Sequence, residues 1–115
     1  MFTYVCLGTD KLERAAAFCD AVLAPLGLSR CNTGGEVDWQ GWAGWGTYLD
    51  GGQTEMALWL CTPFDGRPAT VGNGTMVAFK AASWAAVDEF HAAAIAHGGK
   101  NEGAPSLRPQ YNPDF

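Results

Sequence analysis

The chain has 115 residues, a formal net charge of −5 and 48% hydrophobic residues, which suits one domain with one core and excludes a disordered or fibrous protein. Its 12 acidic and 7 basic residues include no basic cluster, so nucleic acid and anionic membrane surfaces are poor partners. No apolar run approaches the ~20 residues that span a bilayer. The N-terminus lacks the basic-then-apolar pattern of a secretory signal, and we therefore expect a cytoplasmic protein.

The four cysteines lie at positions 6, 19, 31 and 61, and no two of them form a C-x-x-C pair. Zinc ribbons and thiol redox motifs need such close pairs, so neither is indicated. In a reducing compartment we expect four free thiols. Cys6 would need a neighbouring cation or helix N-terminus to become a nucleophile, and the sequence places none beside it.

The first elements along the chain are a strand and a helix. Residues 2–8 are apolar or β-prone without an internal breaker, which is typical of a strand. Asp10 and Glu13 then have the spacing of a capping box, which predicts a helix N-cap at Asp10. Apolar residues recur at helical spacing up to about residue 24, and Pro25 follows to end the helix.

A glycine-rich segment with three tryptophans comes next. A short strand is predicted at residues 28–32, and residues 33–46 then carry many glycines. Large aromatic side chains are common both in mobile lids and in core or interface clusters. Both interpretations are open for the three tryptophans of this segment, Trp39, Trp42 and Trp45.

A hairpin follows the tryptophan-rich segment. Two strand-like runs, residues 46–49 and 55–61, flank Asp50-Gly51. Asp-Gly between β-prone runs predicts a tight turn, because such turns need positive φ. The prolines and glycines of residues 62–74 predict a linker.

The strand–helix pattern then starts again. Residues 75–80 are predicted as a strand, and Ser83 is predicted to cap a helix over residues 84–97. Placing Thr3 on Thr75 aligns the two strand–helix units, with several identical residues. The strand, the helix cap and the terminal glycine all stay in register, which indicates an internal duplication.

Side-chain alternation assigns the two faces of the predicted strands. Val5 and Leu7, like their repeat mates Val77 and Phe79, should pack under the helices. The candidate ligand-binding residues are those turned to the opposite face: Tyr4, Cys6, Tyr48, Glu55, Trp59 and Met76. A soluble protein does not leave large aromatic side chains on an open sheet without a use, so we expect this face to be a pocket or an interface.

Several runs of residues carry a family resemblance: Tyr4-Val-Cys-Leu-Gly-Thr-Asp10, Leu23-Ala-Pro-Leu-Gly27, Pro63-Phe-Asp-Gly66 and Gly72-Asn-Gly-Thr-Met-Val-Ala-Phe79. Together they resemble the small bacterial glyoxalase-like proteins of the vicinal oxygen chelate superfamily, which includes glyoxalases, bleomycin-resistance proteins and extradiol dioxygenases. The resemblance implies an α+β fold of two βαβββ modules with a curled mixed sheet. A single domain of residues 1–115 would then hold module one (1–62), a linker (63–74) and a truncated module two (75–115).

The resemblance also implies where a metal ion would be held. Metal-dependent members place a His on the first strand of each module and a Glu or similar ligand on its last strand, and the ion polarises substrate oxygens as a Lewis acid. The corresponding positions here are Tyr4, Met76 and Trp59, which are poor or impossible ligands for such an ion. Glu55 alone cannot build the site. We therefore expect no cofactor, and a divalent metal only if the ligands align differently.

The expected function is that of a glyoxalase/bleomycin-resistance-like protein that binds a small, partly apolar ligand in an aromatic cleft without metal. One alternative is a metal-dependent enzyme of the superfamily, either lactoylglutathione-lyase-like (a lyase or isomerase) or dioxygenase-like. Another is an assembly role with the aromatic face buried between subunits. No catalytic residue is assigned, since His91 and His97 do not share a helix face. The second module stops before its hairpin, so the chain is either a fragment or a protein that works with half a second module. In the latter case the exposed sheet edges favour a homodimer.

Overall fold

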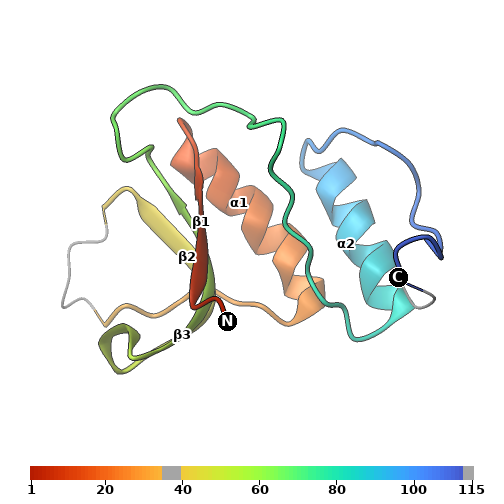
Figure 1. Cartoon of the computed structure of the whole chain (residues 1–115), viewed down its shortest axis with the longest axis horizontal. Helices are drawn as coiled ribbons and strands as arrows, with labels where there is room; N and C mark the ends of the chain where they lie inside the picture. The colour runs from red at the N-terminus through yellow and green to blue at the C-terminus, as the bar shows by residue number, and fades with distance from the viewer. Residues whose placement is uncertain (35–39, 113–115) are drawn as a thin grey trace.

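The computed structural model describes residues 1–34 and 40–112, which form one three-stranded sheet and two α-helices (Figure 1). The elements in chain order are β1 (Tyr4–Gly8), α1 (Leu12–Leu23), the 3₁₀ turn η1 (Ala24–Leu26), β2 (Trp42–Leu49), the 3₁₀ turn η2 (Asp50–Gly52), β3 (Thr54–Cys61) and α2 (Trp84–Ala96). The expected α+β class is confirmed. Neither described helix is long and apolar enough to cross a membrane.

β3 is the central strand of the sheet, whose order is β1–β3–β2. It runs parallel to β1 and antiparallel to β2, so that Val5 and Trp45 both lie opposite Leu58. The predicted hairpin turn joins β2 to β3. Asp50 and Gly51 have φ angles of 53° and 63° there, the positive values for which Asp-Gly is suited.

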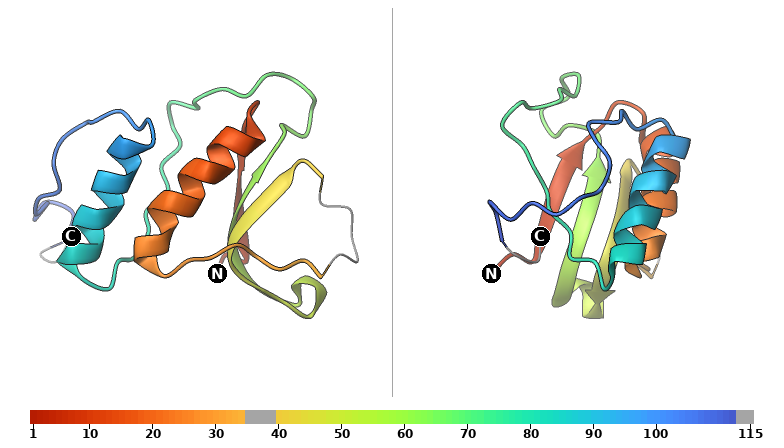
Figure 2. Two further views of the ribbon diagram at one scale, coloured as in Figure 1. Left: turned by 180° about the vertical axis from the view of Figure 1, so that it is seen from behind. Right: turned by 90° about the vertical axis from the view of Figure 1, so that its right-hand side faces the viewer.

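Both helices lie on the same side of the sheet (Figure 2). α1 packs directly on β2 and β3, whereas α2 packs against α1 and η1. The buried core between α1 and the sheet is made of Ala16, Cys19, Val22, Leu23, Ala43, Trp45, Leu58 and Leu60. Val5 and Leu7 pack against this core, which confirms the face that strand alternation assigned to them.

Asp10 does not cap α1, so the capping-box prediction is wrong. The helix begins after Lys11 without a side-chain cap, and the Asp10 carboxylate instead accepts a hydrogen bond from the backbone N–H of Ala69 at 2.8 Å. Local spacing gives no sign that an N–H so distant in the sequence competes for the same oxygen. The cap predicted for α2 is confirmed, because Ser83 Oγ accepts from the backbone N–H of Ala86 at 3.1 Å.

Residues 75–80 do not form the predicted strand and have no regular secondary structure. A strand needs a hydrogen-bonded neighbour, and in the described sheet β1 pairs with β3 alone. Of the two aligned strand–helix units, both helices form, and they begin at the aligned residues Leu12 and Trp84. Phe79 still packs toward α2, with its ring centroid 6.4 Å from that of Phe90. The arrangement in two modules, the second of them truncated, stays a prediction.

β2 begins at Trp42, before the start at residue 46 that the sequence predicted. Trp42 and Trp45 are therefore strand residues, and the lid interpretation is wrong for both of them. Trp39 lies outside the described residues. The sequence did not predict this early start because the strand contains glycines, which are usually depleted in strands.

The short strand predicted at residues 28–32 is reduced to a bridge between Arg30 and Trp45. Two backbone hydrogen bonds support the bridge, from Cys31 N to Gly44 O at 2.8 Å and from Gly46 N to Ser29 O at 3.0 Å. The segment after η1 thus lies against the outer edge of β2.

One carboxylate joins α1 to this edge of the sheet. Asp20 accepts two hydrogen bonds from the Arg30 guanidinium, at 2.8 and 3.1 Å, and one from Trp45 Nε1 at 2.9 Å. The bonds from Arg30, and to a smaller extent the bond from Trp45, hold the pKa of Asp20 below its ordinary value. Trp45 is only 1% exposed, so its N–H depends on this acceptor.

We predict that Asp20→Ala lowers the free energy of unfolding by about 1–3 kcal/mol, because the buried indole N–H loses its acceptor. Urea denaturation measures the change. Asp88→Ala, at an exposed position of α2, is the matched control and should shift the free energy by less than about 0.5 kcal/mol. Equal losses in the two variants would contradict the role given to Asp20.

The charge of Asp20 also gives this contribution a pH dependence. Because the folded-state pKa is lowered, the stabilisation is complete above the unfolded pKa of about 3.9 and is lost as the pH falls through the folded value. Asp20→Asn keeps an acceptor for Trp45 but removes the charge. The stability difference between wild type and Asp20→Asn should therefore shrink as the pH is lowered from about 6 to about 2.

Candidate functional site

The face of the sheet opposite α1 carries aromatic and thiol side chains. The strand registers put Cys6 beside Trp59, and Tyr48 beside Glu55. We call this surface the aromatic face and define it by eight residues: Tyr4, Cys6, Trp42, Gly44, Tyr48, Glu55, Trp59 and Cys61. Five of the six candidate ligand-binding residues lie on it, as strand alternation predicted.

Trp59 is the centre of the aromatic face and is 3% exposed. Its ring centroid lies 5.6 Å from that of Tyr48 and 6.4 Å from that of Trp42, at interplanar angles of 87° and 75°. These are the edge-to-face contacts that aromatic rings favour. Its indole Nε1–H donates to Glu55 Oε1 at 2.6 Å. The ring is therefore fixed both by its neighbours and by its polar group.

Gly44 makes room for Trp59. A Cβ atom at this position of β2 would lie 2.5 Å from two carbon atoms of the Trp59 ring, far inside the distance of an ordinary contact. The indole thus occupies the space that any side chain at Gly44 would need. Glycine in a strand often marks such a close approach.

Two thiols lie close together at the end of the aromatic face that is far from Glu55. Cys6 Sγ of β1 and Cys61 Sγ of β3 lie 3.0 Å apart, with Cys6 exposed and Cys61 buried. Burial, and then the hydrogen bond and charge of Cys61, raise the pKa of Cys6 to about 12. Cys6 is therefore protonated at neutral pH, in line with the expectation that it is not an activated nucleophile.

The aromatic face does not fit a hard divalent ion. Trp59 offers no lone pair, because its indole nitrogen carries the proton that it donates to Glu55. Glu55 and Cys61 are six positions apart on β3, about 20 Å along a strand, so the carboxylate and the thiols do not converge. Among residues 1–34 and 40–112, no three His, Cys, Asp or Glu side chains gather in a group that could hold a metal ion.

Met76 is the one candidate residue outside the aromatic face. It belongs to the irregular segment 75–80 and is 88% exposed, because that segment does not join the sheet. The two histidines are engaged elsewhere. His91 contacts Asn101 at 3.4 Å, and His97 contacts the backbone oxygen of Ala93 at 2.8 Å.

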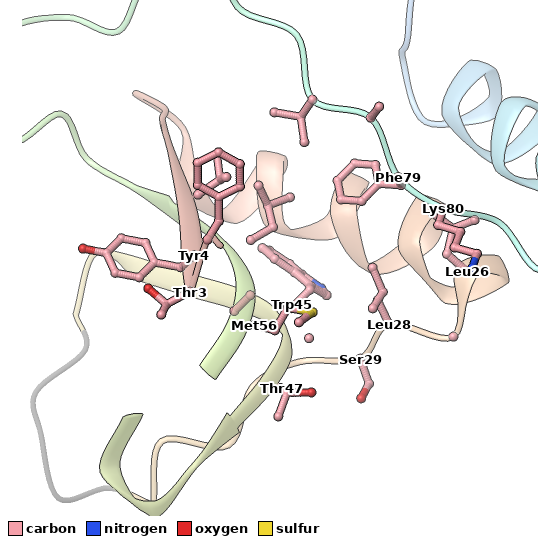
Figure 3. Close-up of a pocket in the computed structure, with 18 residues that line it drawn as sticks. Thr3, Tyr4, Leu26, Leu28, Ser29, Trp45, Thr47, Met56, Phe79 and Lys80 are labelled. Atoms are coloured by element: carbon pink, nitrogen blue, oxygen red, sulfur yellow. The ribbon is translucent and has the colours of Figure 1, made fainter. Parts of the chain in front are cut away.

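A hollow that the sequence did not predict lies on the helix side of the sheet between β1 and residues 77–80 (Figure 3). Its volume is about 470 Å³, and its mostly apolar wall includes Trp45, Leu28 and Phe79. Figure 3 shows the ring of Tyr4 pointing away from Trp45. Residues 77–80, which line one side of the hollow, do not pair with β1, and no local pattern of residues could have predicted that.

Neither a scan against protein-family models nor a search of curated proteins finds a match for the chain. Among solved structures, a glyoxalase/bleomycin resistance protein from Albidiferax ferrireducens T118 is similar, with a TM-score of 0.76 and 33% sequence identity. The alignment covers 94% of this chain and 82% of that chain. The chain belongs to the glyoxalase/bleomycin resistance protein family. The resemblance to the vicinal oxygen chelate superfamily is thereby confirmed.

Three residues of the aromatic face are not among the candidates that the sequence offers. Trp42 and Gly44 lie in the glycine-rich segment, before the predicted start of the strand at residue 46, although the alternation that ends at Tyr48 runs back through both of them. Cys61 lies on the same face, but its contact with Cys6 was not predicted. That contact depends on the parallel register of β1 and β3, which pairing across the whole chain decides.

We predict that Gly44→Ala displaces the Trp59 ring and destabilises the fold by about 1–3 kcal/mol, the usual effect of overpacking. Near-ultraviolet circular dichroism, which reports the fixed environment of aromatic side chains, should change together with the urea midpoint. Gly74→Ala is the matched control, because a Cβ there meets no atom within 4 Å. A control as destabilised as Gly44→Ala would contradict the steric explanation.

Proposed function

We propose that this glyoxalase/bleomycin resistance protein binds a small, partly apolar, ring-containing molecule on the aromatic face without a metal ion. The observation that supports the proposal is the cluster of Tyr48 and Trp42 around Trp59. Small-molecule sites are mostly lined by aromatic and apolar groups with a few fixed polar ones. Tyr4 is 53% exposed on the edge strand β1 and offers a ring on which a ligand can stack.

Glu55 decides which ligand charge is favoured. It is the one charged residue among the eight that define the aromatic face, and the whole chain has a net charge of −5. Complementary charge favours a neutral or cationic ligand and disfavours an anionic one. A glutathione conjugate carries carboxylates, and the eight residues include no Lys or Arg to pair with them. This supports a binding protein of the resistance type over a lactoylglutathione lyase.

The prediction for binding uses two aromatic dyes of opposite charge. Thioflavin T, a cation, should change the tryptophan fluorescence saturably, whereas the anion 8-anilinonaphthalene-1-sulfonate should bind at least about tenfold more weakly, a difference of 1.4 kcal/mol. Tyr4→Ala and Glu55→Gln should each weaken thioflavin T binding by about threefold to tenfold, as lost stacking or lost charge attraction implies.

The control for the dye titration is Trp84→Ala. Trp84 is 75% exposed on α2, outside the aromatic face, so its removal should leave the affinity for thioflavin T unchanged. Equal affinity for the two dyes, or an equal loss in Trp84→Ala, would overturn the proposed site.

Metal analysis separates the binding protein from a metal-dependent lyase, isomerase or dioxygenase. We expect the chain purified without chelator to carry well below one equivalent of metal, because carboxylate and thiols lie about 20 Å apart along β3. One equivalent of nickel, zinc, iron or manganese that is lost in Glu55→Gln would contradict the metal-free proposal and favour the metal-dependent enzyme. Cys31→Ser, at a residue outside the aromatic face, is the control.

We further propose that two copies of the chain associate through β1. The strand is at the edge of the described sheet, and such edges readily pair with another chain. Exposed apolar side chains lie close to it in sequence or register: Phe2 is 73% and Met56 is 73% exposed. Sedimentation velocity at micromolar concentration should show a dimer that Phe2→Asp weakens and Leu107→Asp does not. A monomer for wild type would contradict the association.

A further inference from the structure

We propose that Cys6 and Cys61 form a reversible intramolecular disulfide, so that the aromatic face has a dithiol state and a disulfide state. The two sulfur atoms are 3.0 Å apart, whereas a disulfide bond is about 2.05 Å long. Closing the bond therefore needs each sulfur to move by only about half an ångström. This modification is independent of the ligand proposed above.

The strands hold the two sulfurs together in the folded chain. Cys6 lies opposite Trp59 and Gly8 lies opposite Cys61, so the thiols are diagonal neighbours on adjacent strands. The backbone N–H of Thr9 donates to Cys61 O at 2.8 Å, which extends the pairing of β1 and β3 past the thiols. The contact is thus a product of the sheet, since the cysteines are 55 positions apart in the sequence.

The difference in exposure gives the two thiols different roles. Cys6 is exposed and Cys61 is 5% exposed, so a reagent in solution reaches Cys6 first. Cys61 then lies within reach of the Cys6 sulfur and shielded from the solvent. This is the arrangement of an attacking and a resolving cysteine. Cys19 and Cys31, the remaining thiols, have no sulfur contact within the described residues.

The reaction balances with a small disulfide such as oxidised glutathione. The Cys6 thiolate attacks one sulfur of the reagent, the S–S bond of the reagent breaks, and one glutathione leaves and takes up a proton. The Cys61 sulfur then attacks Cys6 Sγ and displaces the second glutathione, which takes up the proton that Cys61 releases. Two protein thiols are oxidised by two electrons, and one glutathione disulfide is reduced to two thiols.

The high pKa of Cys6, about 12, makes the first step slow at neutral pH, because the thiolate is the attacking form. The equilibrium is set separately by the glutathione pool: where that pool is mostly reduced the dithiol is the resting state, and the disulfide accumulates when the ratio of oxidised to reduced glutathione rises. The bond would join β1 to β3 beside Trp59.

The test treats the full chain with oxidised glutathione at about pH 8.5, where thiol–disulfide exchange is faster, and blocks the remaining thiols with iodoacetamide. Intact mass measured before the iodoacetamide step should show the loss of two hydrogen atoms without a glutathione adduct, and peptide mapping under non-reducing conditions after that step should link Cys6 to Cys61. Reduced glutathione should restore the dithiol. The result on wild type decides the proposal without any variant.

Two variants sharpen the assignment of roles. Cys61→Ser should stop at the mixed disulfide and keep glutathione on Cys6, whereas Cys31→Ser should close the bond as wild type does. A wild-type chain that keeps glutathione on Cys6, links Cys6 to a different cysteine, forms only intermolecular disulfides, or keeps both thiols open to iodoacetamide would overturn the proposal.

Discussion

The structure depends on β3 being buried on both of its faces. From Leu58 to Cys61 every residue of this strand is buried. Leu58 and Leu60 contribute to the core under α1, while Trp59 and Cys61 belong to the aromatic face. The strand that supports the core therefore also positions the site, because successive side chains of a strand point in opposite directions.

The sequence predicted the aromatic face better than it predicted the second half of the chain. Strand alternation needs only local residues, and it put Tyr4, Cys6 and Trp59 on one face correctly. The strand at residues 75–80 failed because a strand exists only with a partner, which no pattern inside those six positions supplies. The cap at Asp10 failed for a related reason, since its acceptor oxygen is used by the distant Ala69 N–H.

In the second half of the chain, α2 forms although residues 75–80, which precede it, do not pair as a strand. α2 forms with its Ser83 cap, and Phe79 and Phe90 still approach each other. Only Ala86 of α2 is fully buried, however, because α2 packs on α1 and η1 instead of on strands. Much apolar surface is consequently exposed, including Met76 and Trp84. Exposed apolar surface of this kind is typical of interaction sites.

The aromatic face is polar at one end and soft at the other. Glu55 lies near the start of β3 and Cys61 at its end, with Trp59 between them. A ligand that stacks on this face would meet a negative charge at one end and sulfur at the other, so a cationic group should be directed toward Glu55. Oxidation of the Cys6–Cys61 pair would remove the S–H groups but leave the Glu55–Trp59 hydrogen bond in place. The two proposals thus assign ligand charge to one end of the face and redox state to the other.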